Sequence, residues 1–159
     1  MRVSTPVGSD HQLARLLQIG MVLEEVVEAR AHKHHETLSD VDDDVVALLE
    51  EAAEESAEHR QRLEELVGEL EADPVAYEEI ERLVAAQDEA DTNTDGVLYD
   101  QLASEETAYK FYDDLIGAIE NSDVRFGIDR DRLLTVLREI RADEEDGVEA
   151  VTRLMETRE

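Results

Sequence analysis

Apolar residues recur along most of this chain at intervals of three and four residues, which is the spacing of one face of an α-helix. No stretch shows a strong alternation of apolar and polar residues, as a half-buried strand would. The most regular stretch has inward positions that step alternately by four and three residues: Val45, Leu49, Ala52, Ser56, His59, Leu63, Leu66 and Leu70. Such a seam is typical of a helix packed in a bundle, so the pattern predicts an all-α protein.

Capping and helix-breaking residues divide the periodic stretches into four long helices. Ser9 or Asp10 caps the first, Asp73-Pro74 closes the second, and Asp129 caps the fourth. The expected ranges are 9–35, 42–72, 98–121 and 130–156. Short loops join the first helix to the second and the third to the fourth, which makes each pair antiparallel neighbours.

The second and third helices are separated by a long connection, residues 73–97, in which a short helix is expected at 75–87. A connection of this length crosses the bundle. We therefore expect one domain over residues 1–159, a four-helix bundle with one crossover, preceded by a flexible N-terminus at residues 1–8.

Each of the four helices carries one acid or imidazole on its inward side. His59 lies on the seam of the second helix, Glu105 on that of the third and Glu144 on that of the fourth. In the first helix one frame places Glu24 inside with Leu13, Leu17, Gly20, Val27 and Ala31, and a neighbouring frame through Leu17, Met21, Glu24 and Glu28 also fits. Inward acids are costly unless they are paired, protonated or bound to metal. Their positions relative to the turns place all four at one level of the bundle.

The third helix has Glu105, then the small Ala108, then Tyr112 one turn further. With the inward glutamates and the helix order, this resembles the ferritin-like superfamily, especially its rubrerythrin-type members, over all four long helices. In that family the first and third helices each supply a Glu, the second and fourth each supply Glu-x-x-His, and the set binds two iron or manganese ions. The resemblance implies metal-dependent oxidation or peroxide reduction. Because the chain has no cysteine for a rubredoxin-like site, electrons would come from an outside donor.

Two positions depart from the family pattern. The second helix reads Ser56-Ala-Glu-His59, with serine in place of the glutamate, and the fourth reads Glu144-Glu-Asp-Gly147, with glycine in place of the histidine. The ligands that remain are Glu24, His59, Glu105 and Glu144. This reduced carboxylate-histidine set suits iron or manganese, and zinc as well. Around it we place Glu55, which flanks the seam and would replace the lost carboxylate, together with Ser56, Tyr109 and Tyr112.

A metal-free reading accounts for the same residues. His59 would then be a core histidine bonded to Ser56 or to an inward glutamate, and Glu105 and Glu144 would be a buried pair, protonated or bonded to tyrosine. The protein would be a degenerate ferritin-like bundle that serves as a structural or protein-interaction module. In either case the resemblance implies a homodimer paired along the first two helices.

The net charge of the chain indicates the environment of the protein and the kinds of partner that it can bind. The chain has 15 Lys+Arg against 43 Asp+Glu, a formal net charge of −28, with 42% hydrophobic residues. This combination indicates a folded protein whose surface repulsion is screened at high salt, as in the cytoplasm of an extreme halophile. No basic patch favours nucleic acid or an anionic membrane surface. No apolar run approaches a membrane span or a signal sequence, so a soluble cytoplasmic protein is expected.

Two local motifs have simpler explanations than metal binding. His32 and His35 share a face near the end of the first helix, where cations are favourable. The stretch from Asp91 to Leu102 imitates a calcium loop but has leucine at the position that needs a bidentate glutamate. We expect it to be a polar loop that caps the third helix.

Overall fold

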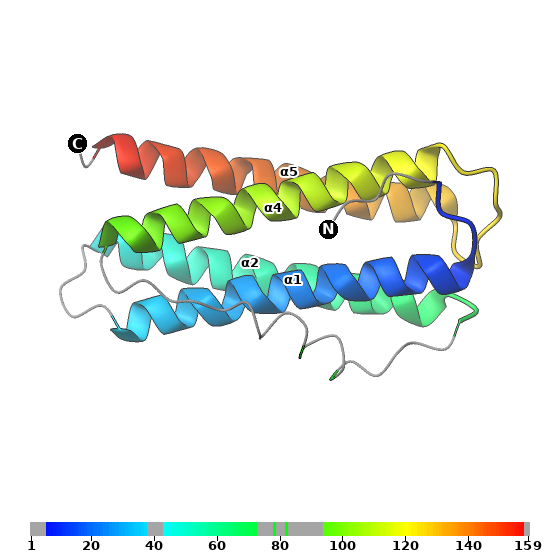
Figure 1. Ribbon diagram of the computed structural model, residues 1–159, viewed down its shortest axis with the longest axis horizontal. Coiled ribbons are helices and arrows are strands. Elements are labelled where there is room, and N and C mark those ends of the chain that lie inside the picture. The colour runs from blue at the N-terminus through cyan, green and yellow to red at the C-terminus, as the bar shows by residue number, and fades with distance from the viewer. Residues whose placement is uncertain (1–5, 38–42, 73–77, 79–81, 83–93, 158–159) are drawn as a thin grey trace.

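The computed structural model describes residues 6–37, 43–72, 78, 82 and 94–157 (Figure 1). Within these residues the chain forms four α-helices and no strand: α1 (Asp10–Thr37), α2 (Asp43–Glu69), α4 (Thr94–Glu120) and α5 (Arg130–Thr157). The predicted all-α class and the four long helices are confirmed. The short helix expected at 75–87 lies outside the described residues except for Glu78 and Arg82, and so does the start of the calcium-like stretch at 91–93.

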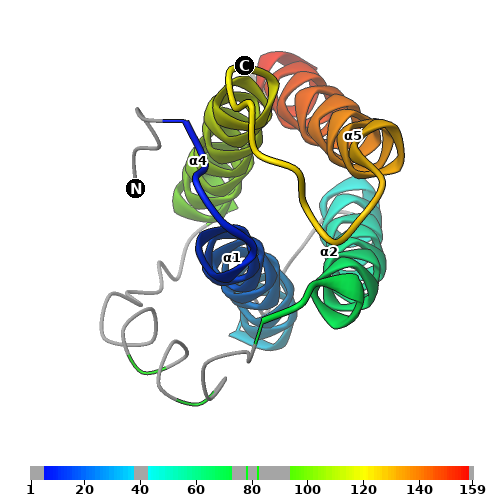
Figure 2. The same cartoon turned by 90° about the vertical axis from the view of Figure 1, so that its right-hand side faces the viewer.

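The helices form a square bundle when viewed along their axes (Figure 2). α1 packs most extensively on α2, and α4 on α5, while the contacts of α1 with α4 and of α2 with α5 close the square. Both sequence-adjacent pairs are antiparallel (Figure 1). α2 ends and α4 begins at opposite ends of the bundle (Figure 1), which is the arrangement that the predicted crossover requires.

The predicted caps are present at two helix starts. Ser9 accepts a hydrogen bond on Oγ from the Gln12 amide at 3.1 Å, and Asp129 accepts one on Oδ2 from the Arg132 amide at 3.3 Å. α4 begins at Thr94, earlier than the expected Leu98. Near the N-terminus Val7 is fully buried, and its amide donates to the carbonyl of Ala118 at 3.1 Å. This part of the segment expected to be flexible is therefore fixed to the bundle.

The apolar core is divided into two clusters along the bundle. The larger fills the end where α1 begins and includes Leu17, Leu63, Tyr112 and Leu137. The smaller fills the other end and comprises Ala31, Val45, Leu49, Ala53 and Val97. The residues of each helix that lie between the clusters supply a buried polar layer.

The predicted inward frame of α2 is buried at every position from Val45 to Leu70. In α1 the frame through Gly20 and Glu24 is the buried one, whereas Glu28 of the alternative frame is only partly buried. Gly20 faces the core closely, because a Cβ at this position would lie 3.2 Å from both Leu63 Cδ1 and Phe111 Cε1. The absence of a side chain at Gly20 lets α1 approach its neighbours about one helical turn before Glu24 and the polar layer.

Candidate metal centre

One acidic or imidazole side chain from each helix enters the polar layer. Glu24 of α1 is 0% exposed, His59 of α2 1%, Glu105 of α4 7% and Glu144 of α5 3%. The four residues that the seam spacing predicted to face inward are therefore buried. Burial of three carboxyl groups with one imidazole demands compensation by protons, hydrogen bonds or a cation.

Three of the four side chains form a tight inner group: Glu24, His59 and Glu144. One ligand atom from each lies within 4.8 Å of the others. His59 Nδ1 is 3.3 Å from Glu24 Oε1 and 3.2 Å from Glu144 Oε1. Two ligands bound to one transition metal through bonds of about 2.1 Å lie roughly 3.0–3.4 Å apart. The two distances from His59 Nδ1 fall within this range.

Glu24 has one oxygen that is bonded and one that is not. Tyr112 donates its hydroxyl hydrogen to Glu24 Oε1 at 2.7 Å. Glu24 Oε2 is fully buried and has no hydrogen-bond partner among the described residues. A buried carboxylate oxygen without a partner is expensive, and a bound cation would remove that cost.

The opposite side of the His59 ring faces two more carboxylates. His59 Nε2 is 2.9 Å from Asp143 Oδ2 and 3.9 Å from Glu55 Oε1. A metal-ligating histidine commonly donates its second ring N–H to a carboxylate, which orients the ring and selects the tautomer. Asp143 is placed to accept such a bond from Nε2, which would leave the Nδ1 lone pair directed at Glu24 and Glu144.

Glu105 flanks the inner group beside Gly147. Gln101 donates its side-chain amide to Glu105 Oε1 at 2.9 Å. A Cβ on Gly147 would lie 2.7 Å from Glu105 Oε2, so this carboxylate occupies the space that a side chain at position 147 would need. Glu105 is also hydrogen-bonded to Glu144, although it lies outside the tight three-residue group.

The electrostatics of the layer favour bound protons when no cation is present. Burial, with the negative charge of Glu24 and a hydrogen bond with Glu105, raises the pKa of Glu144 far above its usual range. Burial lowers the pKa of His59, but hydrogen bonds and charge from Glu24 and Asp143 outweigh it and raise that pKa to about 9. Burial raises the pKa of Glu55 to about 7. Burial and Glu24 raise the pKa of Tyr112, which therefore stays a hydrogen-bond donor.

Five carboxyl groups surround one imidazole in this region: Glu24, Glu55, Glu105, Asp143 and Glu144. In the part of the chain that the structure describes, the ion pairs of these groups involve His59 alone. One imidazolium can neutralise only one carboxylate, and the remaining carboxylates repel one another in a medium of low polarity. The layer is thus short of positive charge and would gain from a divalent ion.

The surrounding residues differ in part from those the sequence indicated. Tyr112 bonds to Glu24 in the inner group, whereas Tyr109 is only partly buried, and Ser56 is buried on the seam of α2. Asp143 and Gln101 were not predicted. Asp143 has a side chain that is 45% exposed, and in sequence it is one acid in a run of acids. The feature of the sequence that could have identified Asp143 is its position immediately before the inward Glu144.

A second buried polar contact lies nearer the end of α1. His34 is 1% exposed, and its Nε2 is 2.8 Å from Asp100 Oδ2 of α4. Arg30 is 3.4 Å from the other oxygen of Asp100. The sequence had pointed instead to His32, which is exposed, together with His35. The contact joins α1 to α4 and involves one carboxylate, so it has the character of a structural ion pair.

The described helices include none with the length and apolarity needed to cross a membrane. Comparisons of the chain with protein-family models, with curated proteins and with solved structures find no match.

Proposed function

We propose that this chain is a ferritin-like, rubrerythrin-like metal-binding protein that holds one divalent transition-metal ion in its buried polar layer. The observation that carries the proposal is the buried group of Glu24, His59 and Glu144, whose ligand atoms lie within 4.8 Å of one another and in which Glu24 Oε2 has no hydrogen-bond partner among the described residues. Carboxylates with one imidazole suit iron(II) or manganese(II), and zinc also accepts this donor set. The Glu-to-Ser and His-to-Gly departures at positions 56 and 147 argue for one ion in place of the family's two.

Each residue of the layer would have a distinct role in binding the ion. His59 would bind through Nδ1 while its Nε2–H donates to Asp143. Glu144 would give up its proton to become a ligand, and Glu24 would bind through its unpartnered oxygen while Oε1 keeps its bond from Tyr112. Glu105, held by Gln101, would support Glu144 or bind as a fourth ligand. A transition metal in this place supplies Lewis-acid or one-electron redox chemistry.

Metal content tests the proposal directly. The protein is purified in high salt, stripped with a chelator and reconstituted separately with Fe²⁺, Mn²⁺ and Zn²⁺, and bound metal is measured by elemental analysis. We expect about one ion per chain for the wild type and a loss of stoichiometric metal in His59→Ala. His32→Ala, which removes an exposed histidine of α1, is the matched control and should retain the metal. Retention of metal in His59→Ala would contradict the assignment.

The resemblance to rubrerythrin-type proteins further suggests a role in iron or peroxide handling. We expect the iron-loaded protein to reduce hydrogen peroxide when an external electron donor is supplied, and His59→Ala to lack this turnover. An iron-loaded wild type that neither consumes peroxide nor oxidises Fe²⁺ faster than buffer would leave a metal-binding protein without this activity.

A second candidate is a metal-free bundle that acts as a structural or protein-interaction module, most simply a homodimer. It is favoured by the finding that both ring nitrogens of His59 already have carboxylate partners. A protonated His59 and a protonated Glu144 would then close the layer without a cation. This candidate predicts no stoichiometric metal in the wild type after reconstitution, and a dimer by light scattering in high salt.

A further inference from the structure

We propose that a divalent cation reaches the inner group through a cavity between α2 and α5, passing Glu55 and Glu105 to arrive at His59 and Glu144. The inference rests on the proposed metal binding and adds the path and the selectivity of uptake. The cavity has a volume of about 300 Å³. Its lining residues come from α2 and α5, apart from Glu105 of α4.

The cavity exists because small residues line it. Ala47 and Ala52 of α2 face Gly147 and Ala150 of α5 across it. Without larger side chains at these positions the two helices leave a space that the remaining residues do not fill. Gly147 contributes most at the inner end, because its missing side chain leaves the carboxylate of Glu105 in contact with the cavity.

The inner end of the cavity meets the metal-binding layer. Glu55, whose side chain is 33% exposed, has its Oε1 3.9 Å from His59 Nε2. Glu105, which also lines the cavity, is hydrogen-bonded to Glu144. Each of these carboxylates therefore contacts both the cavity and a residue of the inner group. A cation between them would exchange water for carboxylate oxygen before it reached full burial.

The charge of the lining selects the kind of solute that enters. Asp44, Glu51 and Asp146 are exposed acidic residues of the lining, and no basic residue lines the cavity in the part of the chain that the structure describes. Acidic walls of low polarity concentrate cations and repel anions such as phosphate. One water needs roughly 10–15 Å³ of cavity space, so a cavity of about 300 Å³ has room for a partly hydrated metal ion. The cavity suits a small hydrated cation.

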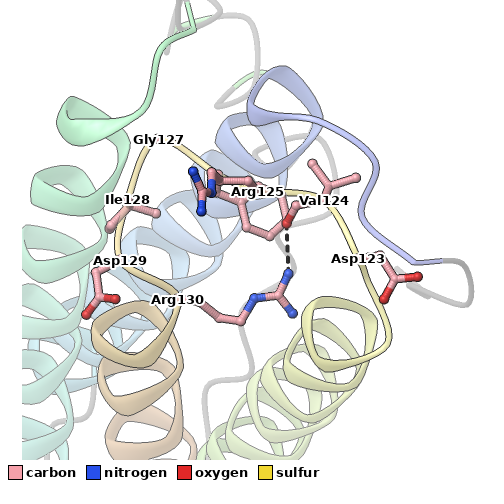
Figure 3. Close-up of a pocket in the computed structure, with 8 residues that line it drawn as sticks. Asp123, Val124, Arg125, Gly127, Ile128, Asp129 and Arg130 are labelled. Carbon is pink, nitrogen blue, oxygen red and sulfur yellow. Dashed lines mark hydrogen bonds between the residues drawn. The ribbon is translucent and has the colours of Figure 1, made fainter.

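Two other cavities are less suitable as routes. One lies between α1 and α4 and is lined mainly by apolar or small residues with Arg30, whose charge opposes a cation. Another is formed by the α4–α5 loop, residues 123–130, at the end of the bundle (Figure 3). There Arg130 donates to the carbonyl of Val124 at 2.8 Å and to that of Ile119 at 3.0 Å, so its guanidinium stabilises the loop. Neither lining includes Glu55 or Glu105, the two carboxylates that connect the cavity between α2 and α5 to the inner group.

Blocking the cavity tests the route by its effect on rate. Uptake of Co²⁺, whose visible absorption changes on coordination, is followed by stopped flow in Ala150→Phe and in the control Ala142→Phe. Both alanines are exposed on α5, but only Ala150 lines the cavity. We expect association and dissociation in Ala150→Phe to slow at least tenfold, with an unchanged Kd, and wild-type rates in Ala142→Phe. Circular dichroism confirms that each variant is folded.

The exposed charge of the cavity lining provides a second test that leaves the volume intact. Glu51→Gln combined with Asp146→Asn is compared with Glu50→Gln combined with Glu145→Gln. Both pairs remove two charges from exposed positions of α2 and α5, and only the first pair lines the cavity. We expect the first pair to lower the association rate severalfold relative to the second, and the difference to shrink as salt is raised.

The outcomes separate the two proposals. Wild-type protein that binds no Co²⁺ would overturn the metal site and the route with it. If the wild type binds Co²⁺, and Ala150→Phe and the Glu51→Gln/Asp146→Asn pair bind it at the same rate, the route is overturned but the metal site is not. A slower Ala150→Phe with an unchanged Kd supports it.

Discussion

Glu105 Oε2 lies 2.7 Å from the place where a Cβ on Gly147 would stand, so the carboxylate of one helix fills a space left open by the glycine of another. The ferritin-like pattern expected from the sequence would place a histidine ligand at position 147. Here α5 has a glycine there, and Glu105 of α4 occupies the neighbouring volume while Gln101 donates a hydrogen bond to it. Glu105 thus fills the space directly beside Gly147, and both residues border the cavity between α2 and α5.

Gly147→Ala should therefore destabilise the protein even though alanine is the better helix former. The methyl group has to displace a carboxylate held by Gln101 and Glu144, and overpacking of this kind costs about 1–3 kcal/mol. Gly117→Ala in α4 is the control, because a Cβ there meets nothing within 4 Å and should stabilise by about 0.5–1 kcal/mol. Chemical denaturation in high salt measures both. Equal stabilisation by the two alanines would show that Glu105 is not held against Gly147.

The helical seams made much of this architecture predictable. In α2 the strict alternation of four and three residues identified His59 as buried, because any frame that exposes it would also expose Leu63 and Leu66. The same reasoning left two frames open in α1, where Met21 and Gln18 are buried beside the Gly20 frame and widen the apolar face. A helix that packs on two neighbours buries a broad stripe, so periodicity alone does not select its central residue.

Asp143 and Gln101 could not be found in the same way. Each lies one position from a predicted inward residue, and each contributes through the length and direction of its side chain. His34 differs from them, because it lies three residues after Ala31 and continues the inward frame of α1. Asp143 reaches His59 from a half-exposed position, and in a chain with 43 acidic residues nothing local separates it from solvated neighbours. Contacts of this type depend on how α2 and α5 are placed relative to each other, which the pattern of a single helix does not specify.

Glu144→Gln and Glu24→Gln should have opposite effects on the metal-free protein. Glu144 is held protonated by burial and by Glu24, so a neutral amide of the same shape should leave the stability at pH 7 unchanged or raise it. Glu24 bonds to both Tyr112 and His59, and loss of its charge leaves a buried imidazolium poorly compensated, at a cost of about 3 kcal/mol. Unfolding free energies at pH 7 distinguish them, and a Glu144→Gln variant as unstable as Glu24→Gln would contradict the protonation of Glu144.

The metal-free protein should lose stability as pH rises from 7 to 9.5. The pKa of His59 is raised from 6.5 to about 9 in the folded state, so its stabilising contribution is fully present below 6.5 and lost as pH passes through 9. The loss amounts to about 3 kcal/mol from the size of the shift. The raised pKa of Glu55 acts in a different window, because it lowers stability between pH 4.5 and 7.

Urea unfolding at constant ionic strength, repeated at several pH values, measures this slope. His59→Gln is the control, and its stability should be nearly independent of pH between 7 and 9.5. A slope in the variant equal to that of the wild type would assign the effect to other groups.

Metal binding should have the opposite pH dependence. A metal ion requires a neutral His59 and an ionised Glu144, so each ion that binds has to release the protons that these groups carry near pH 7. We expect the association constant to rise by between one and two powers of ten per pH unit from pH 6 to 8. Calorimetry in two buffers of different ionisation enthalpy counts the protons released, and Glu144→Gln should release one fewer. An affinity independent of pH above 6 would instead identify binding to surface carboxylates, which are ionised throughout that range because their ordinary pKa is about 4.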